Sequence, residues 1–388
     1  MKGCVAIFLF YFLCTDISAQ TGALSGMVRD GEENRGLSSA NVFLSNATNG
    51  TQTNSQGHFL LRKIKPGQYD LVVSHVGYDT WVKRITINQD TQRFEIKLHP
   101  NNIKLREVVI GHDPNWARNY ANFKRIFIGS GENSGKCIVS NPKILSLFFD
   151  SRLKRLEASS DEFLIIENEY LGYRLKYLLK EFEWLQQSGL TYYAGQVLFE
   201  NLNGTARQLK RWKENRRQAY FGSNLHFFRL LRSGNLHENG YLVRSLQRIK
   251  VADRPSDAYI LEKIRTFHRN ASNPNDSLAY WRKLYRSPKA ISLIGREKLE
   301  SGDIAKPTNL PNLHALDYQT DLHLIYEPKK VYNPYSRIRE HPTTIIAFQK
   351  RPVLFDLNGV VANPRSVIYE GAWNQGIVEL LPQDYEPE

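Results

Sequence analysis

Residues that could carry out chemistry are scattered along this sequence, and the spacings that common hydrolases need are missing. Ten histidines occur, yet none begins an H-x-x-E or H-E-x-x-H sequence, which would place two metal ligands on one turn or helix. A G-x-S-x-G nucleophile elbow is also missing. The sequence therefore predicts no zinc carboxypeptidase site, no serine hydrolase of that type, no other metal site and no cofactor.

A glycine-rich run at residues 129–137 looks like a phosphate loop but departs from it at two positions. Ser130 stands where the loop needs its first glycine, and Cys137 stands where a hydroxyl would hold magnesium. We interpret the run as a loop that follows a helix. Cys137 itself is expected to be a small buried hydrophobe rather than a nucleophile.

Paired acidic residues leave one route to catalysis open. Asp161 is followed by Glu162, and Glu181 lies two residues before Glu183. Glycosidases use two carboxylates that face each other across a cleft. Neighbouring acids on strands are usually solvated surface residues, which is how we interpret these pairs. A hydrolase acting on glycan or peptide, with its site in residues 115–388, remains the alternative hypothesis.

A dense group of cations is the strongest local feature. It is interleaved with Leu209 and Trp212, which should anchor the inner face of a helix, and its cations are Arg207, Lys210, Arg211, Lys213, Arg216 and Arg217. Lys210 and Glu214 have the spacing of a helical ion pair. The group is either a solvated helix face or, together with Trp212, an anion-binding surface.

The charge of the whole chain narrows the partners of such a surface. The formal net charge is +13 at pH 7, which favours an anionic partner. Export, argued below, disfavours nucleic acid. The expected partners are therefore an acidic glycan, lipopolysaccharide, an anionic lipid surface or another envelope protein.

The elements that carry this group belong to a long second region. Trp116, Tyr120, Phe123 and Phe127 recur at helical steps, which predicts a helix over 115–128. Helical spacing returns over 206–232, with a break near Gly222 and a stop at Gly234. Strand-like runs occur on both sides of this stretch. We predict a mainly antiparallel α+β domain over residues 115–388.

The first region has the alternation of short strands. Ala40, Val42 and Leu44 alternate with polar residues, and turn pairs such as Asp30-Gly31 and Pro66-Gly67 separate the runs. Six or seven strands in about 80 residues predict a β-sandwich. Tyr78 and Trp81 are candidate glycan-binding residues if they are exposed on one face, and core residues otherwise.

The order of these motifs brings in a family. Gly26-x-Val28-x-Asp30, Thr53-x-x-x-Gly57-x-Phe59, Pro66-Gly67-x-Tyr69 and Val76-Gly77-Tyr78 resemble the carboxypeptidase-like regulatory domain of Bacteroidetes envelope proteins. The resemblance covers residues 22–99 and implies a transthyretin-like sandwich, an accessory module without a reaction of its own. Two blocks farther along resemble a region that follows this module in uncharacterised Bacteroidetes envelope proteins.

The N-terminus predicts export. Lys2, an apolar run over residues 5–13 and Ala19 have the order of a signal peptide, so we expect residues 1–19 to be removed. Cys137 is then the last cysteine, and no internal disulfide is possible. No later apolar run approaches the length of a membrane-spanning helix. The expected location is the periplasm or the outer membrane.

The predicted organisation is a signal peptide (1–19), the sandwich (20–100), a linker (101–114) and the α+β domain (115–388). Within the linker, residues 105–111 resemble the segment that joins this module to the plug of TonB-dependent receptors. We hypothesise a non-enzymatic envelope protein that binds or scaffolds. Besides the hydrolase, carbohydrate binding by the sandwich through Tyr78 and Trp81 is a further alternative.

Overall fold

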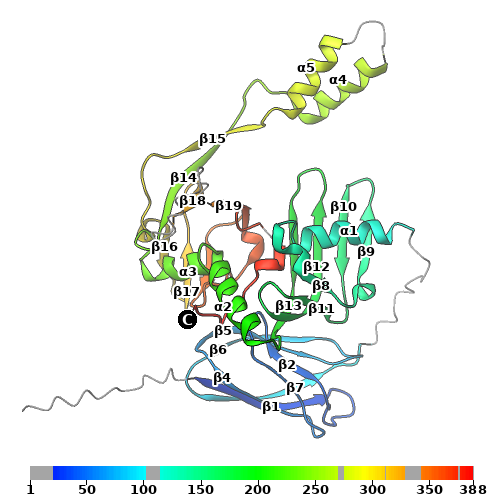
Figure 1. The fold of residues 1–388 in the computed structure, drawn as a ribbon, viewed down its shortest axis with the longest axis vertical. Helices are drawn as coiled ribbons and strands as arrows, with labels where there is room; N and C mark the ends of the chain where they lie inside the picture. The colour runs from blue at the N-terminus through cyan, green and yellow to red at the C-terminus, as the bar shows by residue number, and fades with distance from the viewer. Residues whose placement is uncertain are drawn as a thin grey trace, which may run out of the picture.

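The computed structural model describes residues 21–101, 114–269, 275–310, 312–327, 342–374 and 376–387. The predicted signal peptide (1–19) lies outside the described residues, as does almost all of the predicted linker (101–114). The described residues form an N-terminal sandwich, a second part with a long antiparallel sheet, a third part with two smaller sheets, and an arm that leaves the third part (Figure 1).

The sandwich packs two sheets face to face. In one, β1 (Gly22–Asp30) lies between β4 (His58–Ile64) and β7 (Thr91–Leu98); the other has the order β3 (Gly50–Gln52), β2 (Asn41–Leu44), β5 (Gly67–Ser74) and β6 (Trp81–Ile87). Alternate residues of β1 are buried, as the period-two pattern predicts. Gly26 is required here, because an added Cβ would lie 2.1 Å from the Phe94 carbonyl oxygen. The predicted sandwich is confirmed.

The second part is built on one long strand. β12 (Tyr173–Leu185) pairs along its whole length with β13 (Thr191–Asn201), and on its other side with β11 (Leu164–Asn168) and then β10 (Arg155–Ser159). The outer strands are β8 (Cys137–Val139) and β9 (Ser146–Asp150), and the helices are α1 (Trp116–Phe127), η1 (Glu132–Lys136) and η2 (Pro142–Ile144). The helix predicted over 115–128 is confirmed, and its Phe123 and Phe127 are fully buried.

The third part follows two helices, α2 (Ala206–Tyr220) and α3 (Asn224–Ser233), which separate at Gly222 as predicted. Its larger sheet has the order β15, β14, β18, β19 and β21, and its smaller sheet the order β16, β17 and β20. The bounds are β14 Tyr241–Lys250, β15 Ala290–Ile294, α6 Ser301–Ile304, β16 Ala305–Pro307, β17 Leu313–Leu316, β18 Asp321–Tyr326, β19 Thr343–Phe348, β20 Val353–Asp356, η3 Pro364–Ser366, β21 Val367–Gly371 and η4 Gly376–Glu379.

Residues 114–387 contain two main hydrophobic cores among those described, one under the β12 sheet and one between α3 and the sheets of the third part. Both parts mix helices with antiparallel strands, so the predicted α+β class is confirmed. None of the described helices has the length and apolar character needed to span a membrane.

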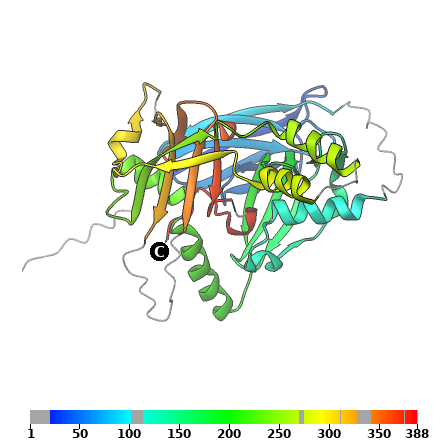
Figure 2. The same cartoon turned by 90° about the horizontal axis from the view of Figure 1, so that it is seen from above.

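The arm is a projection that the sequence did not predict. The far ends of β14 and β15 run away from the sheet as a two-stranded stalk, which carries the helical hairpin α4 (Asp257–Arg269) and α5 (Asn275–Arg286). Figure 1 shows the hairpin standing apart from the sheets, and in Figure 2, seen from above, it overlaps the second part of the protein. We use "the arm" for residues 246–294.

Candidate functional site

Helix α2 carries the predicted basic group, and its inner face is fixed by Trp212. The helix starts with a capping box between Thr205 and Gln208. Trp212 is buried, and its indole Nε1 donates to the Glu169 carbonyl oxygen at 2.8 Å. The ring lies where a side chain at Gly172 would be, 2.2 Å from an added Cβ. Trp212 therefore attaches α2 to the turn before β12, as its predicted anchoring role requires, and does not face an external ligand.

Arg216 is also used inside the protein. Its Nε donates to the Leu171 carbonyl oxygen at 2.6 Å and its Nη2 to the Gly172 carbonyl oxygen at 2.8 Å. The guanidinium lies over the Tyr173 ring, 3.7 Å from the centroid. Asn215 donates to the Tyr170 carbonyl oxygen beside it. These contacts stabilise the docking of α2 on the second part, so Arg216 has a structural role.

The other cations of α2 face solvent. Arg207, Lys210, Arg211, Lys213 and Arg217 are exposed. Arg217 lies 3.8 Å from Glu214, which takes the place of the predicted contact between Lys210 and Glu214. The prediction that Leu209 packs inward is wrong, because its side chain is half exposed. The predicted anion-binding group thus divides into an exposed set and the two inward residues, Trp212 and Arg216.

Tyr78 and Trp81 both pack against the sandwich core. The Tyr78 hydroxyl donates to Asp30 at 2.5 Å, a bond that lowers the pKa of Asp30 and raises the pKa of Tyr78. His75 meets the Tyr78 ring edge-on at 5.1 Å. Trp81 begins β6 and is half-buried. Both rings therefore lie at the edge of the core and are partly exposed.

The remaining titratable candidates are held in structural contacts. Burial lowers the pKa of His226 to about 4, and its Nδ1 accepts from the Gly222 amide. Burial raises the pKa of the Cys137 thiol to about 12. Glu181 pairs with Arg365, and Glu183 lies 3.8 Å from Arg155. Within the described residues no three metal-ligating side chains gather.

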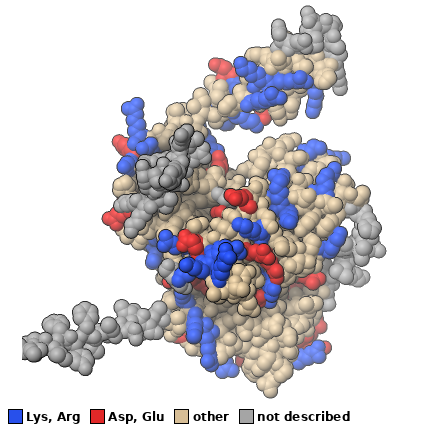
Figure 3. Space-filling view, in the orientation of Figure 1, with Lys and Arg blue, Asp and Glu red and all other residues tan. Residues whose placement is uncertain are grey.

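The arm carries a basic surface on α5. Arg282, Lys283 and Arg286 follow Ala279 at steps of three, four and seven residues, which places them on one helix face. With Ala279 and Ser287 they line an open, shallow hollow of about 580 Å³. Figure 3 shows Lys and Arg side chains gathered along the hairpin, and a further group near the centre of the same view. Sequence reasoning missed this surface, although the spacing of Leu278, Trp281 and Leu284 was an available signal.

The opposite face of α5 forms a thin core with α4. Ile260 is fully buried, and the Trp281 ring meets Tyr259 at 5.9 Å. Tyr259, Tyr280 and Tyr285 remain about half exposed. Aromatic rings thus lie next to the cations on the hairpin, which is a common composition of binding surfaces.

Arg254 holds the hairpin on its stalk. Its side chain is 6% exposed, and its Nη1 bonds Asp257 at 2.8 Å. Its Nη2 donates to the Tyr285 carbonyl oxygen, and Lys289, the residue before β15, also pairs with the Asp257 carboxylate. Lys289 and Arg254 lower the pKa of Asp257. These contacts join the first turn of α4 to the end of α5 and to the strand that follows, so they hold the hairpin at the end of the stalk.

The family comparison concerns the sandwich. Residues 24–110 match the family model described as a CarboxypepD_reg-like domain. The N-terminal module is a CarboxypepD_reg-like domain. The match runs past the predicted boundary at residue 100 into the predicted linker. The comparison with curated proteins gives no match to this chain.

Solved structures give weak likenesses. One is 3-chlorocatechol 1,2-dioxygenase from Rhodococcus opacus 1CP, with 12% identity over 22% of this chain and 62% of that chain and a TM-score of 0.18. Another is the pilus 2b backbone protein of group B streptococcus, with 16% identity, 21% and 42% coverage and a TM-score of 0.18. A third is a Bacteroides uniformis protein described as a "putative carbohydrate binding protein", with 8% identity, 47% and 99% coverage and a TM-score of 0.18. This chain spans less than two thirds of the first two, and at these TM-scores none of the likenesses carries an argument.

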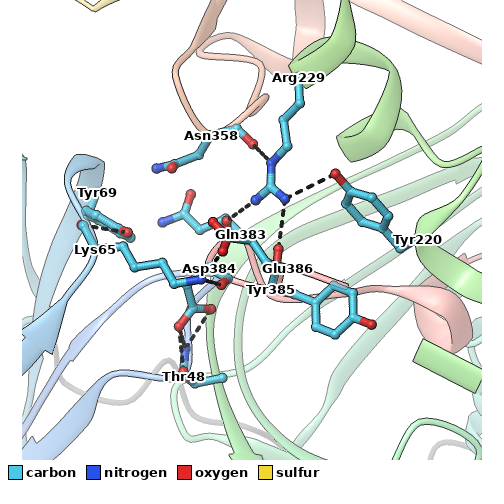
Figure 4. A network of polar contacts seen from close by, with 10 residues as sticks. All are labelled: Thr48, Lys65, Tyr69, Tyr220, Arg229, Asn358, Gln383, Asp384, Tyr385 and Glu386. Atoms are coloured by element: carbon cyan, nitrogen blue, oxygen red, sulfur yellow. Dashed lines mark hydrogen bonds and ion pairs between the residues drawn. The ribbon is translucent and has the colours of Figure 1, made fainter. Parts of the chain in front are cut away.

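The CarboxypepD_reg-like domain is tied to the rest of the body by the C-terminal segment (Figure 4). Asp384 accepts from both the amide and the hydroxyl of Thr48 on the domain. Lys65 of the same domain donates to the Asp384 carbonyl oxygen at 3.0 Å and pairs with Glu386 at 3.0 Å. Residues 383–386 therefore form one side of a junction.

Arg229 of α3 forms the other side of that junction. Its guanidinium donates to the carbonyl oxygens of Gln383 at 2.7 Å, Tyr385 at 2.8 Å and Asn358 at 3.0 Å. The Asn358 side chain donates in turn to the Gln68 carbonyl oxygen of the CarboxypepD_reg-like domain. We use "the body" for the described residues outside the arm. Several elements of the body thus meet at one polar junction, and none of the residues labelled in Figure 4 belongs to the arm.

Proposed function

We propose that this chain is a non-enzymatic binding protein of the cell envelope, and that the arm is its binding surface for an anionic partner. The observation that carries the proposal is the open hollow on α5, which Arg282, Lys283 and Arg286 line on a projecting hairpin. The accessory nature of the CarboxypepD_reg-like domain and the predicted signal peptide support the non-enzymatic and envelope parts of the proposal.

The charge of the arm supports its role as the surface that binds an anionic partner. Residues 246–294 contain ten Lys and Arg against four Asp and Glu, a large share of the net charge of +13. A group of exposed cations attracts anions before contact, and salt screens this attraction. Binding through the arm is therefore expected to weaken steeply as the salt concentration rises.

Shape supports a binding role over catalysis. A catalytic cleft would be expected to enclose its substrate among converging polar groups. The α5 hollow is open and basic, and the second prominent hollow, on the CarboxypepD_reg-like domain, is lined by Pro66, Asn88, Gln89 and Asp90. Neither brings two carboxylates together, so the arrangement favours recognition of a surface.

The test uses two charge reversals of equal size in the mature protein, with immobilised heparin as the polyanion. The first variant is Arg282→Glu/Lys283→Glu/Arg286→Glu on α5, and the second is Arg207→Glu/Lys210→Glu/Arg211→Glu on α2. Both sets of cations are exposed, and both variants have the same net charge. We expect the α5 variant to elute from heparin at a clearly lower salt concentration than the α2 variant.

Equal elution of the two variants would mean that net charge alone governs binding, and the proposed role of the arm would be wrong. Circular dichroism and urea unfolding of both variants serve as folding controls. If the α2 variant instead elutes at the lower salt concentration, the surface that binds the anionic partner is on α2.

A further inference from the structure

The outer edge of the stalk is an unused sheet edge. β15 is the terminal strand of its sheet, and in the described part of the chain it pairs with β14 alone, from Lys250 opposite Ala290 to Leu246 opposite Ile294. In an antiparallel pair, alternate residues direct their amide and carbonyl groups away from the partner strand. β15 therefore presents a row of main-chain donors and acceptors to the outside.

One face of this edge strand is apolar and exposed. Ile291 is 57% exposed and Leu293 51%, and the opposite residue Ile249 is 44% exposed. The register places these three side chains on the same face of the stalk. Edge strands with exposed apolar side chains are a known route to unwanted pairing, and natural proteins usually cover or charge them. Here the strand carries no charged residue from Ala290 to Ile294.

We infer that β15 is a docking edge, where an extended acidic segment of a partner protein adds a strand to the sheet of the third part. The inference rests on the proposed binding role of the arm and narrows the partner to a protein. Main-chain bonds along β15 would supply affinity, and apolar side chains at alternate positions of the segment would pack beside Ile291 and Leu293.

The chemistry of the edge selects a polypeptide. A lipid surface would cover Ile291 and Leu293 but would leave the outward amides and carbonyls of β15 without partners, which is costly. A glycan could accept those hydrogen bonds but has no apolar side chains for the exposed face. A β-strand satisfies both requirements at once.

The charges around the edge select an acidic segment. Lys250 lies on β14 opposite Ala290, the first residue of β15, and Arg296 follows the end of β15 by two residues; both are exposed, and no ion pair is found for either among the described residues. The cations of the α5 hollow lie farther along the same arm. Pairing of β15 with β15 of a second copy would bring these like charges together, which is destabilising. Charge complementarity therefore favours a different, acidic partner.

The test measures fluorescence anisotropy of a labelled, capped peptide in which glutamate and valine alternate, titrated with the mature protein. We expect saturable binding. The same peptide with methyl groups on alternate backbone nitrogens should bind at least about tenfold more weakly, because it cannot complete the strand ladder. A lysine and valine peptide should also bind more weakly, because of the cations of the arm.

Paired protein variants locate the binding. Ile291→Ser/Leu293→Ser should weaken peptide binding about tenfold or more, whereas Leu310→Ser should not change it. Leu310 is a matched control, since it is 55% exposed on the same part of the chain and outside the arm. Hydrogen exchange should show protection of residues 290–294 when the peptide is bound.

Several outcomes would overturn the inference. These are no binding of the glutamate and valine peptide, equal binding of its methylated form, or equal losses in the Leu310→Ser control. Protection of residues 290–294 by phosphatidylglycerol vesicles or by self-association, in place of the peptide, would assign the edge to lipid or to a second copy. Heparin elution of the α5 variant tests the proposed function separately, because Ile291 and Leu293 are unchanged in it.

Discussion

Helix α2 and the α4–α5 hairpin have similar compositions, but their cations differ in what they contact. Both combine Arg and Lys with a tryptophan. On α2, Trp212 and Arg216 turn inward and bond the main chain of the second part. On the hairpin, Trp281 joins a thin core, while Arg282, Lys283 and Arg286 line an open hollow. The difference shows that a basic, aromatic composition predicts a surface only when the contacts of each side chain are known.

The largest expected effect is on the anchored helix. Trp212→Ala removes a buried ring that fills the space over Gly172 and Gly204, and should lower the free energy of unfolding by about 3–5 kcal/mol. Leu209→Ala on the same helix should cost less than about 1 kcal/mol, because Leu209 is half exposed. Urea unfolding measures both. Similar losses in the two variants would contradict the anchoring role of Trp212.

Substitutions of Arg216 and Arg211 compare a cation of α2 that bonds the main chain with one that faces solvent. Arg216→Met should lower the free energy of unfolding by about 1–3 kcal/mol, because the Leu171 and Gly172 carbonyl oxygens lose a charged donor. Arg211→Met should have an effect within about 0.5 kcal/mol. Thermal unfolding of the two variants decides whether the distinction holds, and equal shifts would remove it.

Acid should act on the body and the arm in opposite directions. In the body, burial raises the pKa of Asp356 to about 6. The folded protein therefore binds a proton more tightly than the unfolded chain, and the resulting stability is full below about pH 4 and is lost as the pH rises through about 6. This contribution is on the order of 1–3 kcal/mol.

Asp356→Asn isolates that effect. The substitution keeps an oxygen that can accept from the Asn358 and Val360 amides, which now bond Asp356 Oδ1. We expect the variant to gain stability relative to the native protein as the pH rises from 4 to 7, measured by urea unfolding at several pH values. If the difference in unfolding free energy between the variant and the native protein does not change with pH, the raised pKa of Asp356 is contradicted.

The arm should respond to acid with the opposite sign and a smaller effect. Lys289 and Arg254 lower the pKa of Asp257, so the stabilising ion pairs are present above the ordinary carboxyl pKa and are lost as the pH falls through the lowered value. Amides of α4 and α5 should therefore lose protection in acid before those of β12. Hydrogen exchange at several pH values measures this, with Asp257→Asn as the variant in which the dependence disappears.

Sequence patterns predicted the elements whose buried residues recur at the regular spacing of one strand or one helix. The β1 alternation, the α1 spacing and the break between α2 and α3 at Gly222 were all readable, because each depends on neighbours within a few residues. The inward position of Trp212 followed in the same way. Leu209 was misplaced because the face that α2 buries depends on Gly172 and Tyr173, which lie more than thirty residues earlier.

The arm and the junction depend on long-range contacts. Arg282, Lys283 and Arg286 are close together in the sequence, but their place on a projecting hairpin depends on the packing of α5 against α4, which local spacing does not show. The exposure of β15 follows from its position at the end of a sheet. The bonds of Arg229 to Gln383 and Tyr385 join residues more than 150 positions apart. No spacing rule on one chain segment could predict these contacts.

Hydrogen exchange of the mature protein with and without a heparin oligosaccharide tests the central claim most directly. The account predicts that protection appears over α4 and α5 of the arm and leaves α2 and the CarboxypepD_reg-like domain unchanged. Protection confined to residues 206–220, or to the sandwich around Tyr78 and Trp81, would contradict it.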